Sequence, residues 1–145
     1  MAILSIRTIG DPVLRTETKP VDEITDQTKK LIENMKDTMY DASGVGLAAP
    51  QVGISKQIII VDVGDGPLTL INPEIVDSSG AEIDEEGCLS IPGENGKVER
   101  ASKIVVEALN SDGEEVEIEA EGLLARALQH EIDHLEGTLF VDKVK

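Results

Sequence analysis

The residues best suited to chemistry in this 145-residue chain form the pattern His-Glu-Ile-Asp-His, which runs from His130 to His134. Side chains four positions apart on a helix lie one above the other, so both imidazoles can bind the same metal ion. Glu131 lies beside them, where its carboxylate can take a proton from water activated by that metal. The alternative is a solvated helix with two surface histidines. It is disfavoured because the chain has no other histidine and because Leu123 and Ala127 make the same face partly apolar.

A catalytic site of this kind needs a third protein ligand and one open position for water. Many metalloproteases with this motif take the third ligand from a downstream His or Glu, but residues 137–145 contain neither and offer only the side-chain carboxylate of Asp142. Cys88, the only cysteine of the chain, is the better candidate. A lone cysteine is more often buried packing, but a two-histidine site that lacks a third ligand favours the metal role. A single cysteine also excludes an internal disulfide and favours a reducing compartment.

A third segment, residues 44–53, is rich in glycine and alanine and contains Gln51. Small residues let the backbone approach a ligand closely, and Gln51 offers an amide donor among apolar neighbours. The segment is not a phosphate-binding loop, because it lacks the Gly-Lys-Ser/Thr ending. Tight packing of a helix end onto a sheet would explain it equally well.

Hydrophobic periodicity predicts the elements that must position these residues. Thr25 or Asp26 is expected to begin a helix, and a second helix is expected over residues 121–135, with Gly137 as its stop signal. Strands are expected over residues 57–63, 68–76, 81–90, 103–109 and 115–120, with a turn at 64–67 and a hairpin at 110–113. Pro92, Gly93 and Gly96 indicate a break after the third strand. Strands followed by a helix predict an α+β fold.

Composition limits the partners of the chain. We find no repeat or linker, so residues 1–145 are expected to form a single domain. A net charge of −16 disfavours binding to bare nucleic acid and to anionic membrane surfaces. The longest strongly apolar stretch, residues 58–63, is too short to span a bilayer. We therefore expect a cytoplasmic protein.

Taken together, the three segments resemble the peptide deformylase family. Its motifs G-x-G-x-A-A-x-Q, E-G-C-L-S and H-E-x-D-H match residues 44–51, 86–90 and 130–134 in that order. The similarity continues through residues 10–15, 71–73 and 134–140. It implies small antiparallel or mixed sheets packed around a central C-terminal helix that carries the metal motif. It also implies removal of the formyl group from the N-terminal methionine of new polypeptides, with release of formate.

The resemblance implies one divalent metal ion held by Cys88, His130 and His134. This ion is usually Fe²⁺, and Zn²⁺, Ni²⁺ and Co²⁺ also suit such ligands. Glu131 would act as general acid and base. The side-chain amide of Gln51 and the backbone N–H of Leu89 would stabilise the oxyanion.

The resemblance also implies where the substrate lies. An extended formyl-methionyl peptide would pair with the backbone near Val45, Gly46 and Gly87. Its methionine side chain would enter an apolar pocket formed by Val45, Leu123, Arg126 and Ala127. Arg126 departs from an apolar lining and is expected to add a charge there. A further expectation is that Asp133 and Arg100 pair and hold the helix against the sheet.

The expected partners are the formyl-methionyl peptide and, transiently, the ribosome, and the protein is expected to be a monomer. Two other functions stay open. One is an amidase or peptidase that uses the same metal chemistry. The other is a protein in which the metal is only a structural staple. Structural sites usually fill all four positions with Cys or His, and this chain offers three such residues.

Overall fold

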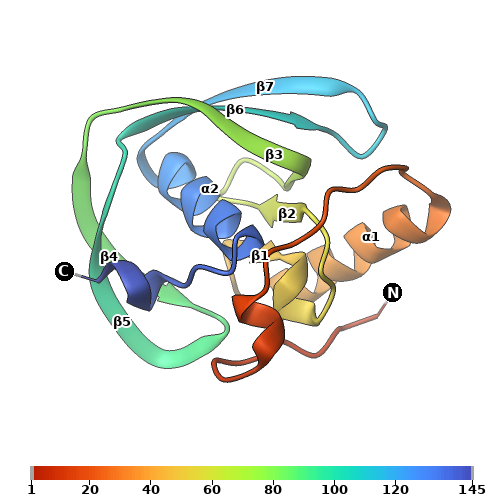
Figure 1. Ribbon diagram of the computed structural model, residues 1–145, viewed down its shortest axis with the longest axis horizontal. Coiled ribbons are helices and arrows are strands. Elements are labelled where there is room, and N and C mark those ends of the chain that lie inside the picture. Colours follow the sequence, from red (N-terminus) through yellow and green to blue (C-terminus); the bar gives the residue numbers. More distant parts are fainter. Residues whose placement is uncertain (1, 145) are drawn as a thin grey trace.

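A five-stranded sheet and a two-stranded sheet surround the C-terminal helix in the computed structural model, which describes residues 2–144 (Figure 1). The larger sheet has the order β1-β2-β3-β6-β7, with β1 Gly46–Ala48, β2 Ile58–Val61, β3 Leu68–Ser79, β6 Lys103–Leu109 and β7 Glu115–Glu121. The smaller sheet pairs β4 Glu82–Cys88 with β5 Ile91–Arg100. The helices are α1 Asp26–Asp41 and α2 Gly122–Leu135, with 3-10 turns η1 Pro12–Arg15, η2 Ala49–Val52 and η3 Phe140–Lys143. The expected α+β fold is confirmed.

The helix α2 lies at the centre of the molecule because one of its faces is apolar (Figure 1). Leu128, Ile132 and Leu135 are buried in one core cluster with residues of β2, β3, β6 and β7. The helix ends where the sequence indicated, and Gly137 has φ +77°, which an L side chain rarely adopts. The buried stripe fixes the rotation of α2, and so fixes which way its histidines point.

Strand β2 is buried on both faces, which explains its unbroken run of β-branched residues. Ile59 and Val61 belong to the cluster beneath α2. Ile58 and Ile60 belong to a second cluster that includes Met35 of α1. The strand therefore holds α1 and α2 on opposite faces of one sheet, with β1 beside it.

The helix α1 begins as the sequence predicted. The hydroxyl of Thr25 accepts a hydrogen bond from the backbone N–H of Thr28, and the Thr28 hydroxyl accepts one from the backbone N–H of Thr25. This reciprocal capping box satisfies donors that the first turn of a helix leaves free.

The expected break at Pro92, Gly93 and Gly96 is wrong, because β5 runs through all three residues. Cys88 lies opposite Ile91 and Gly87 lies opposite Asn95, so residues 92–94 bulge out of the pairing. A bulge accommodates a proline that cannot donate and a glycine with φ +81°. Strand β3 is also longer than predicted, because its pairing with β6 continues to Ser79.

The hairpin between β6 and β7 is confirmed. Oδ1 of Asn110 accepts hydrogen bonds from the backbone N–H groups of Asp112 and Glu114. Across residues 2–144, no helix combines the length and apolar character needed to cross a membrane.

Asn72 fastens the segment before α1 to the large sheet. Its φ is +53°, at a register shift of β3, where asparagine is tolerated better than most side chains. Its side chain accepts a hydrogen bond from Val21 N at 2.7 Å and donates one to Val21 O at 2.9 Å. The side chain thus pairs with Val21 as a neighbouring strand would.

We expect Asn72→Ala to lower the free energy of unfolding by about 2–3 kcal/mol, from two lost hydrogen bonds and a left-handed backbone that alanine disfavours. Urea denaturation followed by circular dichroism measures the change. Ser78→Ala, at an exposed position of the same strand, is the control and should stay within about 0.5 kcal/mol. Equal effects of the two substitutions would contradict the role given to Asn72.

Candidate active site

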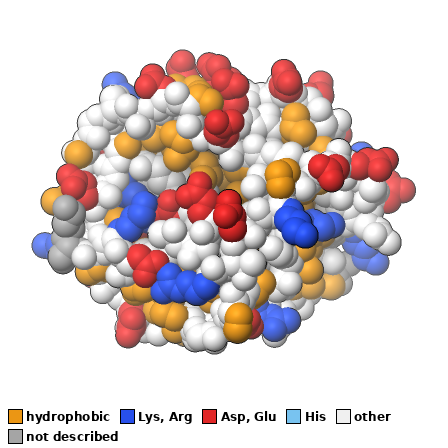
Figure 2. Space-filling view, in the orientation of Figure 1, with side chains coloured by type: hydrophobic (Ala, Val, Ile, Leu, Met, Phe, Trp, Pro, Cys, Tyr) orange, Lys and Arg blue, Asp and Glu red, His pale blue; other side chains and the backbone are white. Residues whose placement is uncertain are grey.

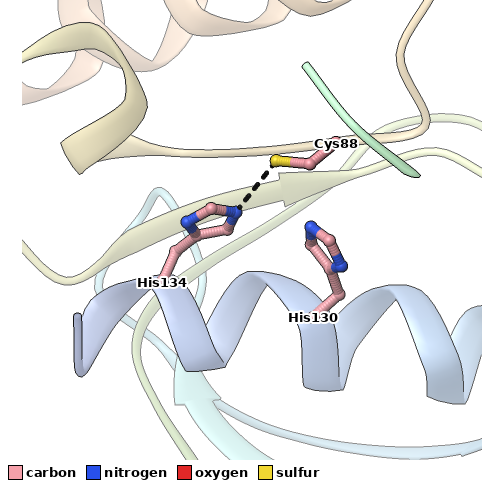
Figure 3. A group of neighbouring side chains, drawn as sticks. All are labelled: Cys88, His130 and His134. Atoms are coloured by element: carbon pink, nitrogen blue, oxygen red, sulfur yellow. Dashed lines mark hydrogen bonds between the residues drawn. The ribbon is translucent and has the colours of Figure 1, made fainter. Parts of the chain in front are cut away.

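Cys88, His130 and His134 come together from two elements, as the sequence indicated. Cys88 ends β4, and both histidines lie on α2. One ligand atom from each of the three residues lies within 4.8 Å of the others. The Cys88 sulfur lies 3.4 Å from His134 Nε2, and the His130 ring turns toward the same space (Figure 3). One thiol and two imidazoles are a suitable donor set for a transition-metal ion such as iron or zinc.

Glu86 orients the imidazole ring of His130 through a hydrogen bond. Its Oε1 lies 2.8 Å from His130 Nδ1, and both side chains are buried. Burial alone would raise the pKa of Glu86, but hydrogen bonds with His130 and Arg100 outweigh it and lower that pKa well below its usual range. The ionised carboxylate therefore accepts a hydrogen bond from the Nδ1–H group of His130. The lone pair of Nε2 is then available to a metal. Carboxylates commonly hold metal-binding histidines in this way.

The two histidines have different electrostatic environments. Burial lowers the pKa of His134 to about 3, so this imidazole is neutral, as a metal ligand must be. Burial acts in the same direction on His130, but Cys88, Glu86 and Glu131 outweigh it and raise its pKa to about 10. The surroundings of His130 thus favour positive charge, which a bound cation supplies.

Glu131 is buried next to the two histidines, and burial raises its pKa to about 7. A carboxyl group with a pKa near neutrality can both accept and donate a proton. Its Oε1 and His134 Nδ1 are buried atoms that have no hydrogen-bond partner among residues 2–144. Such unpaired polar groups are rare in folded proteins, and the free oxygen of Glu131 beside the histidines indicates that a polar partner binds there. The site therefore fits a metal ion and a polar substrate.

The small residues before Gln51 make room for site side chains. A Cβ atom added to Gly46 would lie 2.5 Å from Glu131 Oε2, and one added to Gly44 would lie 2.7 Å from Leu89 Cδ1. A larger residue at either position therefore requires the side chain of Glu131 or Leu89 to shift. Tight packing, one of the two explanations that the sequence left open, therefore applies to Gly44 and Gly46, which pack against Leu89 and Glu131.

A cavity of about 290 Å³ opens beside these groups. Every site residue expected from the sequence lines it except His134, which is almost fully buried. Those lining residues are Val45, Gly46, Gln51, Gly87, Cys88, Leu89, Leu123, Arg126, Ala127, His130 and Glu131.

Four further residues line the cavity, namely Ser43, Gly44, Glu85 and Glu86, to which the sequence analysis gave no site role, although its motifs include Gly44 and Glu86. Glu86 is the most important of them. The available signal was a carboxylate two positions before the proposed cysteine ligand. The expected pair of Arg100 and Asp133 is confirmed, and Arg100 also binds both oxygens of Glu86 at 2.9 Å.

Arg126 lines the cavity as expected, but its charge is compensated within the protein. Its Nη1 donates to Glu86 Oε2 at 2.6 Å and to the carbonyl of Val98 at 3.0 Å. Its Nη2 donates to the carbonyl of Glu82 at 2.9 Å. The guanidinium group therefore ties α2 to both strands of the small sheet instead of leaving a free charge in the cavity.

Comparisons with known proteins agree with this geometry. A family model described as polypeptide deformylase matches residues 3–145. A peptide deformylase from Halothermothrix orenii is 64% identical over 99% of this chain and 95% of its own length. The crystal structure of peptide deformylase from Thermotoga maritima has a TM-score of 0.98 and 49% identity, covering 100% of this chain and 99% of that one. A peptide deformylase from Synechococcus elongatus in complex with actinonin has a TM-score of 0.96 and 48% identity. The match covers 98% of this chain and 79% of that one.

We expect Arg126→Met to lower the free energy of unfolding by about 3 kcal/mol, near the lower end for breaking a buried ion pair, because Arg100 still compensates Glu86. Arg15→Met is the matched control, since Arg15 pairs with Asp142 at the surface and should cost less than about 1 kcal/mol. Urea denaturation of both variants measures the two losses in the free energy of unfolding. A loss no larger for Arg126 than for Arg15 would show that the buried network contributes little.

Proposed function

The chain belongs to the polypeptide deformylase family, and we propose that Cys88, His130 and His134 hold the metal ion of its reaction. It is a metal-dependent hydrolase that removes the formyl group from the N-terminal methionine of new polypeptides and releases formate. The observation that supports the residue assignment best is the approach of one thiol and two imidazoles to within 4.8 Å beside buried Glu131. Three protein ligands are typical of a catalytic metal site rather than a structural one.

The metal is proposed to be Fe²⁺, with Zn²⁺, Ni²⁺ and Co²⁺ as alternatives for the same ligands. When bound, such an ion polarises the formyl oxygen and makes water acidic enough to attack near neutral pH. Glu86 keeps the His130 ring turned toward the ion through its hydrogen bond to Nδ1.

Glu131 is proposed to move the proton. Its carboxylate accepts a proton from the attacking water and passes it to the leaving amine of the methionine, which releases formate. The raised pKa of this group, about 7, suits both steps. Gly46 keeps β1 close to the carboxylate without a side chain in the way.

Gln51 and Leu89 are proposed to stabilise negative charge on the formyl oxygen. Gln51 Nε2 lies 3.5 Å from the Cys88 sulfur, and Leu89 follows Cys88 directly in the chain. A side-chain amide and a backbone N–H can therefore reach an oxygen near the metal. Removing one such donor from an enzyme typically costs about a hundred- to a thousandfold in rate.

The substrate is proposed to lie as an extended strand between β1 and β4. Within the described residues, β1 pairs only with β2 and β4 only with β5, so each strand has one edge available. Val45, Gly46 and Gly87 line the cavity next to these edges. The Synechococcus elongatus peptide deformylase was crystallised in complex with actinonin, which supports a ligand site in this fold.

The methionine side chain is proposed to enter the part of the cavity lined by Val45, Leu123, Arg126 and Ala127. Because Glu86 and two carbonyl groups bind the guanidinium group, the stem of Arg126 can contribute an apolar wall. The pocket is thereby suited to an uncharged thioether side chain.

The protein is further proposed to act as a cytoplasmic monomer with transient contact to the ribosome. Acidic side chains gather over β3, β6 and β7 along the upper rim of the face in Figure 2. Strand β7 alone exposes Glu115, Glu117, Glu119 and Glu121. These charges disfavour contact through ribosomal RNA phosphates on this side.

Anaerobically prepared Fe²⁺ protein is expected to release formate from formyl-Met-Ala-Ser. Glu131→Gln should lower kcat by at least about a hundredfold, because it removes the proton carrier, with metal content unchanged. Glu136→Gln is the control, because Glu136 is an exposed residue directly after the C-terminal end of α2. This variant should keep the parental rate. A parent that binds metal but releases no formate would instead favour the amidase or structural-metal alternatives.

We also expect the Fe²⁺ protein to lose activity in air together with oxidation of Cys88, because an exposed redox metal and a thiolate are both sensitive to oxygen. The Zn²⁺ protein should keep its own activity in air, since zinc has no redox chemistry. The measurement is the rate of formate release by each metal form before and after exposure to air. Mass spectrometry of the peptide that contains Cys88 then reports oxidation of the thiol. Equal loss in both forms would argue against a redox-active native metal.

A further inference from the structure

Ser90 is a fully buried hydroxyl within the site, and none of the proposed reaction steps uses it. It lies two residues after Cys88, and its Oγ is 3.1 Å from Gln51 Nε2. Gln51 is equally buried, with 1% of its surface exposed. A buried hydroxyl facing a proposed oxyanion donor calls for a functional explanation.

The amide of Gln51 has a defined orientation. The backbone N–H of Ala48 points at Oε1 from 2.9 Å, and because this group can only donate, it requires an oxygen there. The nitrogen end must therefore face Ser90 and Cys88. Nε2 donates one hydrogen bond to Ser90 Oγ at 3.1 Å and a second, longer one to the sulfur of Cys88 at 3.5 Å.

Ala48 alone does not fix the plane of this amide. The last torsion of a glutamine side chain has a broad energy profile, so a single hydrogen bond at the oxygen leaves the nitrogen end free to tilt. A second hydrogen bond at the nitrogen removes that freedom. Preorganised donors stabilise developing charge better than donors that must reorient.

We propose that Ser90 is a positioning residue that holds the Gln51 amide so that its second N–H, which points to the Cys88 sulfur, stays directed at the place where the formyl oxygen would bind. The inference rests on the proposed role of Gln51. Ser90 itself does not line the substrate cavity, unlike Gln51. It therefore acts through Gln51 and leaves substrate affinity unaffected.

The backbone around both residues supports this role. Arg7 N donates to the carbonyl of Gln51 at 2.6 Å, and Ile9 N donates to the carbonyl of Ser90 at 2.8 Å. One short N-terminal segment thus binds the two residues that form the hydrogen bond. These main-chain hydrogen bonds help to fix the separation of Gln51 and Ser90 before any substrate binds.

The first test compares metal-loaded Ser90→Ala with the parent in formate release from formyl-Met-Ala-Ser. We expect kcat to fall roughly tenfold, less than for removal of the donor itself, with KM unchanged. Thr38→Val is the control, because it deletes a buried hydroxyl of α1 that bonds Asn34 and Leu4. It should keep the parental kcat. Metal content and thermal unfolding verify that each variant is folded and loaded.

A double-mutant cycle with Gln51→Met separates positioning from a purely structural role. If Ser90 acts through Gln51, Ser90→Ala has almost no further effect on kcat in the Gln51→Met background. Equal effects of Ser90→Ala in both backgrounds would overturn the inference. So would a parental kcat in Ser90→Ala, and that result would leave the deformylase reaction itself standing.

A second readout does not depend on activity. In the Zn²⁺ protein, the Gln51 side-chain NH₂ signals are assigned by their disappearance in Gln51→Met. Ser90→Ala should shift these signals and speed their exchange with solvent, because one N–H loses its acceptor. Unchanged signals would overturn the inference even if the parent proved inactive toward formyl peptides.

Discussion

The buried carboxylate of Glu86 is the interaction on which the site depends. Two guanidinium groups and one imidazole surround it: Arg100 at the end of β5, and Arg126 and His130 on α2. A carboxylate removed from water is stable only with such compensation, and losing one partner leaves a costly uncompensated charge. Because Glu86 lies two residues before Cys88, the same ion cluster fixes both the cysteine and the histidine proposed to bind metal. The small sheet and α2 therefore cannot move independently without breaking the site.

Around this cluster, the apolar packing determines where α2 lies and the polar network determines how its side chains are used. The stripe of Leu128, Ile132 and Leu135 fixes the helix against the large sheet. The remaining surface of the helix contributes Arg126, His130 and Glu131 to the cavity. Within residues 2–144, one carboxylate oxygen of Glu131 has no partner, which costs stability and leaves that atom available for chemistry.

Much of this arrangement could be predicted from sequence, for reasons that are local. Two histidines four apart share a helix face whatever the rest of the fold does, and the apolar stripe predicts α2. Cys88 was predicted as a metal ligand because two histidines leave a catalytic site in need of a third ligand. The direction of Arg126 and the central role of Glu86 were not predictable, because they depend on pairing between β4 and β5 and on its packing against α2. The continuation of strand β5 through Pro92 was not predicted, because proline and glycine are equally typical of a bulge within a strand and of a break between strands.

The site also joins residues far apart in the chain. His134 follows Cys88 by 46 residues, and Thr18 N donates to the carbonyl of Leu135. During synthesis the cysteine and the glutamine are therefore exposed well before the helix that carries both histidines has been translated. A three-ligand metal site can form only after α2 has left the ribosome and docked against the strands. The enzyme that processes new polypeptides thus becomes competent at a late stage of its own folding, and an incomplete chain that ends before α2 cannot capture a metal with these three ligands.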